Sequence, residues 1–111
     1  MTTSSSNLRD RFELLPDDPR WPAGLRDLTH GPELLHAHGE LPDWRRAVSI
    51  VGTRRTDPEG LRFAEGLGHE LAACGHVIVS GGAVGIDAAA HLGALAADGI
   101  TVAVLASGLT P

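Results

Sequence analysis

The chain has 111 residues, a formal net charge of −5, and 42% hydrophobic but only 4% aromatic residues. This length allows one domain, and the negative overall charge excludes binding of nucleic acid by the surface as a whole, so such binding needs a local basic patch. Every basic residue is an arginine, which excludes a lysine-dependent phosphate loop of the Walker A type.

One cysteine, Cys74, excludes an internal disulfide and is expected in a reducing cytoplasm. No stretch is long and apolar enough to predict a membrane span. We therefore expect a cytoplasmic protein without a membrane partner.

The first 45 residues predict a disordered N-terminus at 1–7 and a helical or irregular cap at 8–45. In the cap, three apolar residues at helical spacing predict a short helix: Leu8, Phe12 and Leu15. Residues 33–38 predict a short strand or turn. Four further apolar side chains are expected to pack the cap against a larger unit: Trp21, Leu25, Leu28 and Leu34.

Residues 46–111 alternate between apolar, β-branched runs and helical periodicity. The pattern predicts strands at 47–51, 76–79 and 101–105, a helix that starts at Asp57-Pro58 and ends at Gly75, and a helix at 86–97. Alternation of this kind predicts an α/β fold, a partial Rossmann-like parallel sheet with flanking helices and right-handed crossovers. Three strands leave open sheet edges, so we interpret the unit as a fragment or as part of an assembly.

The most informative stretch is Ser80-Gly-Gly-Ala-Val-Gly-Ile-Asp-Ala-Ala-Ala-His91, which follows a buried strand and opens a helix. Gly81, Gly82 and Gly85 allow a turn without side chains. The first amides of the helix lack partners inside it and carry partial positive charge. The motif therefore predicts a phosphate site, and the alternative is a tight turn that binds nothing.

In parallel sheets, ligands bind beyond the carboxyl ends of the strands. That edge is expected to collect three loops, at 52–57, 80–85 and 106–108. Arg54 and Arg55 belong to it and suit phosphate, whereas Arg45 and Arg46 precede a strand and are expected at the opposite end.

Two other groups of residues have competing interpretations. Asp87 and His91 are four residues apart and are expected side by side on a helix, either as a local pair near the helix N-terminus or as a ligand-binding pair. His36 and His38 share a strand face without a third ligand, so we predict no metal site.

Together these motifs resemble the DNA-processing protein A (DprA/Smf) family. The resemblance rests on Val51-Gly52-Thr53-Arg54, on the motif at 80–91, on Thr101-Val-Ala-Val-Leu-Ala-Ser-Gly108 and on the spacing from Trp21 to Gly39. It implies an extended Rossmann fold, of which this chain is the N-terminal half. It also implies single-stranded DNA binding in DNA uptake, transformation and recombination, loading of a RecA-type recombinase, and a homodimer of the full-length protein.

The resemblance also implies which residues contact DNA phosphates: Gly52, Thr53, Arg54, Arg55, Ser80, Gly81, Gly82, Gly85, Asp87 and His91. The sequence departs from the family pattern at Asp57, where serine or threonine is usual, and at Val84, where a basic residue is usual. No catalytic residue and no cofactor are predicted.

The alternative is a nucleotide-binding or nucleotide-cleaving protein, because the motif from Ser80 to Ile86 is also similar to the first glycine motif of LOG-type phosphoribohydrolases. Those enzymes need a second motif, Pro-Gly-Gly-x-Gly-Thr, which does not occur in residues 1–111. Gly52-Thr53-Arg54 favours the DNA-binding interpretation.

Overall fold

The computed structural model describes residues 11–106, and its main unit is a parallel sheet of three strands. The strands β3 (Ala47–Ser49), β4 (Val77–Gly81) and β5 (Thr101–Val104) lie in the order β3-β4-β5. Sequential order and parallel pairing confirm the expected partial Rossmann-like α/β fold. All three strands end at the same edge of the sheet.

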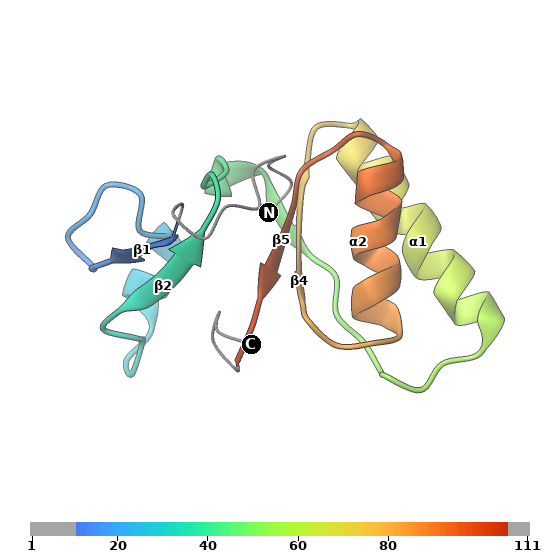
Figure 1. Cartoon of the computed structure of the whole chain (residues 1–111), viewed down its shortest axis with the longest axis horizontal. Coiled ribbons are helices and arrows are strands. Elements are labelled where there is room, and N and C mark those ends of the chain that lie inside the picture. The colour runs from blue at the N-terminus through green and yellow to red at the C-terminus, as the bar shows by residue number, and fades with distance from the viewer. Residues whose placement is uncertain (1–10, 107–111) are drawn as a thin grey trace.

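Two helices connect these strands and cover one face of the sheet (Figure 1). They are α1 (Pro58–Ala73) and α2 (Ile86–Ala96). Successive right-handed crossovers that move in one direction along a sheet place their helices on the same side. The opposite face points toward the N-terminal cap.

The predicted limits of α1 are confirmed. The Asp57 carboxylate accepts a hydrogen bond from the Gly60 amide at 2.8 Å, and Pro58 occupies the first helical position. After the helix, Gly75 takes a φ of +92°, which lets the His76 amide donate to the Leu71 carbonyl at 3.0 Å.

Small residues let the two helices approach closely. A Cβ added to Gly68 would lie 2.5 Å from the Ala90 carbonyl oxygen, and one added to Gly93 would collide with the Glu65 carbonyl. The core beneath them is formed by aliphatic side chains: Ile50, Ala72, Ile78, Ala90 and Ala94. Small residues thus form the helix contact and much of the core, in a chain with only 4% aromatic residues.

The cap contains a strand where the sequence predicted a helix. β1 (Arg11–Leu14) pairs antiparallel with β2 (Leu35–His38), and Leu14 is buried opposite Leu35. Pairing with a distant strand outweighs the local helical spacing, and Leu15 is left exposed. Of the strand or turn predicted within residues 33–38, the structure shows the strand.

Two 3-10 helices complete the cap, η2 (Ala23–Asp27) and η3 (Trp44–Arg46). Trp21 is buried as expected, but Leu28 and Leu34 are exposed, so the predicted packing of these two leucines is wrong. The predicted disorder at 1–7 lies outside the described residues. Within residues 11–106, no helix has the length and apolar character needed to cross a bilayer.

Candidate functional site: the glycine-rich edge of the sheet

Two loops meet at the carboxyl edge of the sheet, one between β3 and α1 and one between β4 and α2. The Ile86 amide donates to the Thr53 carbonyl at 3.2 Å. Gly85 has a φ of +84°, and a Cβ there would lie 2.6 Å from the Thr53 carbonyl oxygen and 2.9 Å from the Arg54 α-carbon. Only glycine permits this contact, so the structure brings Thr53-Arg54 and the glycine turn to one edge.

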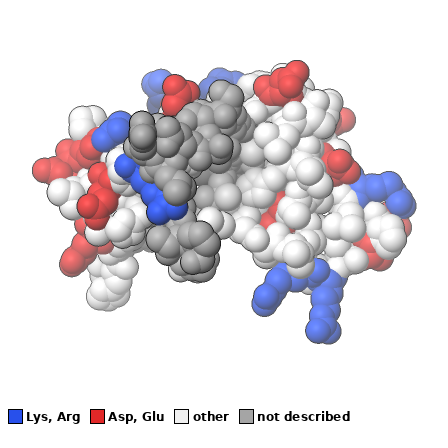
Figure 2. Space-filling view, in the orientation of Figure 1, with Lys and Arg blue, Asp and Glu red and all other residues white. Residues whose placement is uncertain are grey.

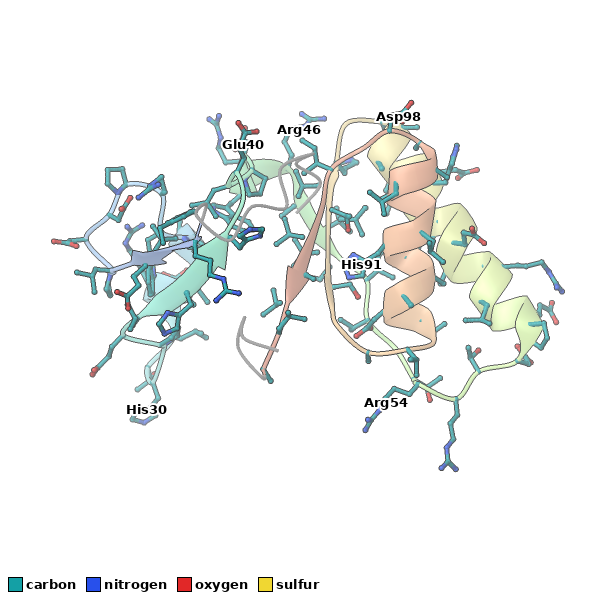
Figure 3. The ribbon with its side chains drawn as sticks, in the orientation of Figure 1. His30, Glu40, Arg46, Arg54, His91 and Asp98 are labelled. Carbon is teal, nitrogen blue, oxygen red and sulfur yellow. The ribbon has the colours of Figure 1, made fainter. Side chains whose placement is uncertain are left out.

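Arg54 and Arg55 carry the positive charge of this edge. Both are exposed, and within residues 11–106 neither guanidinium has a hydrogen-bond or ion-pair partner. Figure 2 shows basic side chains projecting from this end of the molecule, and Figure 3 shows Arg54 directed away from the ribbon. Both cations are therefore open to a ligand.

The other arginine pair lies at the opposite end, as the sequence predicted. Arg46 donates to the Gly75 carbonyl at 2.7 Å, and Figure 3 shows it far from Arg54. Arg45 pairs with Asp43 at 3.0 Å, and its hydrogen bonds hold the pKa of that carboxyl below its usual value. These two cations are engaged within the protein.

The helix N-termini offer fewer free donors than the sequence suggested. The amide of Ile86, the first in α2, is already bonded to Thr53, which leaves those of Asp87 and Ala88 without an acceptor inside the helix. The Thr53 hydroxyl is also engaged, because it accepts from the Arg55 amide at 3.0 Å. Backbone amides thus offer this edge fewer free hydrogen-bond donors than the two guanidinium groups do.

Ser80 is inside the protein. Its side chain is only 3% exposed, and its hydroxyl donates to the Ile50 carbonyl at 2.6 Å. This bond joins the end of β4 to the end of β3. The hydroxyl therefore supports the sheet and does not face the open edge.

His91 also bonds inward, although the sequence placed it beside Asp87. Its Nε2 lies 2.9 Å from the Gly81 carbonyl and its Nδ1 2.6 Å from the Thr101 hydroxyl (Figure 3). A carbonyl can only accept, so Nε2 carries a proton. The expected Asp87–His91 pair does not form, and the imidazole instead fixes the end of β4.

Three glycines keep the edge compact because neighbouring side chains occupy the space of their missing Cβ atoms. A Cβ on Gly52 would lie 2.8 Å from the Ile86 side chain, and one on Gly82 would collide with Leu105. A Cβ on Gly81 would lie 2.6 Å from Oδ2 of Asp87. Their role in this structure is close packing.

Among the predicted site residues, Asp87 has the least expected environment. It is 8% exposed, and its Oδ1 is buried without a hydrogen-bond partner. Its position at the start of α2 suits an acid, because the helix dipole is positive there. A carboxylate at this point also disfavours phosphate directly above it.

Sequence reasoning missed two contacts, one of which begins away from the edge, because Thr101 is the first residue of β5. Thr101 bonds His91, and the Ile86 amide closes the contact between the two loops. A hydrophilic residue at the start of an apolar strand was the available signal for Thr101. The third predicted loop, at 106–108, lies outside the described residues apart from Ala106. No group of three metal-binding side chains occurs within residues 11–106.

Comparison with known proteins adds a family relationship to this geometry. The family model described as DNA recombination-mediator protein A matches residues 13–111. The chain is 41% identical over 102 residues to Protein Smf of Synechocystis sp., a match that covers 86% of this chain and 25% of that protein.

Two further relatives carry DNA-processing names. A putative DNA processing protein DprA of Mycobacterium tuberculosis is 42% identical over 109 residues, with 86% of this chain and 28% of that protein covered. The DNA processing protein DprA of Streptococcus pneumoniae is 36% identical over 113 residues, with 94% and 38% covered. The chain thus spans about a quarter to two fifths of the length of these relatives.

Proposed function

The chain belongs to the DNA recombination-mediator protein A family, and on that premise we propose that its glycine-rich edge binds the phosphates of single-stranded DNA. Two of these relatives are named for DNA processing, and none of the three is named for an enzymatic reaction. We therefore favour a binding role, in DNA uptake and recombination, over nucleotide cleavage.

The observation that carries this proposal is a pair of guanidinium groups beside the glycine turn that have no partner within residues 11–106. Arg54 and Arg55 are exposed, while Arg45 and Arg46 are tied to a carboxylate and to a backbone carbonyl. Arginine forms charge-assisted, often bidentate hydrogen bonds with phosphate. Single-stranded DNA that follows this edge would meet positive charge at one place, where Arg54 and Arg55 lie side by side in the chain.

Phosphate contacts carry no base information, so binding through these arginines is expected for every sequence. By family membership we further propose a RecA-type recombinase as a protein partner and a homodimer as the state of the longer protein. Neither partner has an assigned surface within residues 11–106.

The test is a fluorescence anisotropy titration with labelled single-stranded oligonucleotides. Arg54→Ala is expected to weaken binding roughly tenfold, because a hydrogen bond to a charged group contributes about 1.5 kcal/mol. Arg45→Ala is the matched control, since it removes one arginine at the far end of the sheet. Equal losses for both variants would contradict the proposal, as would unchanged affinity of Arg54→Ala.

A further inference from the structure

Exposed apolar side chains surround the glycine turn. Of the twelve large hydrophobic residues that are exposed within residues 11–106, four lie where the strands of the parallel sheet end, and together they are called the apolar rim here: Val51, Val84, Val104 and Leu105. Single exposed apolar residues are common on proteins, whereas a group of them gathered at one place marks a binding surface. The apolar rim therefore needs an explanation.

The glycine turn brings three members of the apolar rim together. Val104 pairs with Gly81 in the register of β4 and β5, and the Leu105 side chain occupies the space that a Cβ on Gly82 would need. Val84 follows Gly82 by two residues, in the same turn. The two glycines add no side chain of their own between these three residues, so the apolar surface is continuous across the turn.

The apolar rim borders the two exposed arginines. Gly85 comes directly after Val84, and a Cβ added to it would lie 2.9 Å from the Arg54 α-carbon. On the other loop, Val51 precedes Thr53 by two residues. The edge therefore presents two kinds of surface side by side, the guanidinium groups and an aliphatic surface.

A ligand that fits both surfaces must be anionic in one part and apolar in the next. A nucleotide of a single strand has this chemistry, because its phosphate is charged and the flat face of its base is largely apolar and free to contact protein side chains. In a duplex the same face is covered by the stacked neighbouring bases. The charge of the two arginines thus favours a nucleic acid strand as the occupant of the apolar rim.

We propose that a nucleobase of the bound strand lies on the apolar rim while Arg54 and Arg55 hold the neighbouring phosphates. Aliphatic side chains have no hydrogen-bonding groups, so this contact strengthens binding without reading the pattern of donors and acceptors on the base. It follows apolar area withdrawn from water, and unlike a phosphate contact it does not release counterions. This inference rests on the proposed function, because it needs a strand held by the arginines.

The first experiment compares oligo-dT with an abasic strand of the same length by fluorescence anisotropy. The wild-type chain is expected to bind oligo-dT about fivefold tighter, the factor that corresponds to about 40 Å² of apolar surface withdrawn from water. This ratio is expected to be the same at low and at high sodium chloride, although both affinities fall with salt. Equal binding of the two strands, or a ratio that disappears at high salt, would overturn the inference while the proposed function stands. Failure to bind either strand would overturn both.

Two variants test the apolar rim itself, Val84→Ala and the double variant Val84→Ala/Leu105→Ala. Val84 is 67% exposed, so its replacement is expected to leave the fold intact. Each variant is expected to lower the ratio between oligo-dT and the abasic strand, the double variant to about one, without weakening binding of the abasic strand. Leu28→Ala is the matched control, because it shortens an exposed leucine of the cap, and it is expected to leave the ratio unchanged. An unchanged ratio in the double variant would overturn the inference.

The second experiment asks whether the apolar rim is instead covered by another copy of the chain. Sedimentation equilibrium without DNA measures the state of association of the wild-type chain and of the double variant, and the two are expected to be the same. A wild-type dimer that the double variant loses would show that the apolar rim joins two copies, and that result would overturn the inference.

Discussion

The hydroxyl of Ser80 and the imidazole of His91 both end on main-chain carbonyls, those of Ile50 and Gly81. Each joins the end of β4 to a neighbouring element. They are polar because the ends of buried strands present carbonyl groups that need donors. At the residue scale, these side chains hold the position of the turn, while Arg54 and Arg55 remain exposed beside it.

Ser80→Ala is expected to lower stability by about 1–2 kcal/mol, because it removes a buried hydrogen bond. The fall in Tm is then about 4–8 °C per kcal/mol, measured by circular dichroism. Ser49→Ala, at an exposed serine of β3, is the control and is expected to change little. A Ser80→Ala variant of unchanged Tm but weaker DNA binding would show that the hydroxyl reaches the ligand.

The identity of most edge residues could be predicted from the sequence, but their roles could not. Glycines after a strand indicate a tight turn, and Arg54 follows a strand directly, so both could be assigned to the same edge. The inward direction of Ser80 and His91 depends on partners about 30 and 10 residues away in the chain, at Ile50 and at Gly81 and Thr101. No local pattern specifies those contacts.

At the scale of elements, α1 and α2 could be predicted closely because each limit has a local cause. Asp57-Pro58 begins α1 and Gly75 ends it, and both signals lie within the segment itself. β1 could not be predicted, because its structure comes from pairing with β2 more than 20 residues later. Long-range pairing is the part of the fold that periodicity alone does not reveal.

The contact between the helices gives a prediction for two glycines of α1. Gly68→Ala is expected to destabilise the protein by about 1–3 kcal/mol, because the new methyl group would meet the Ala90 carbonyl. Gly66→Ala is the control: nothing lies within 4 Å of its added Cβ, so the change is expected to stabilise by about 0.5–1 kcal/mol. Urea unfolding measures both, and a stabilising Gly68→Ala would mean that the helices lie further apart.

At the scale of the whole molecule, two arginine pairs lie at opposite ends of the sheet, Arg45-Arg46 and Arg54-Arg55, while the net charge is −5. The proposed DNA binding would therefore depend on a few contacts at one end, with no support from the overall charge. Such binding weakens with salt in proportion to the phosphates that are neutralised.

The double variant Arg54→Ala/Arg55→Ala tests this dependence. Each phosphate contact to a single strand contributes about −0.7 to the slope of log affinity against log salt, so the variant is expected to flatten the slope by about 1.4. Anisotropy titrations at several sodium chloride concentrations measure it. An unchanged slope would place the phosphate contacts on other residues.

The hydrogen bond between the two loops, from the Ile86 amide to the Thr53 carbonyl, couples α2 to Arg54. Thr53 is bonded to the first amide of α2, and the same helix is wedged against α1 at Gly93. A displacement of α2 would then be transmitted to the Thr53-Arg54 loop, and through His91 also to the end of β4. A partner that displaced the C-terminal end of α2 would therefore also move Arg54, at the other end of the helix.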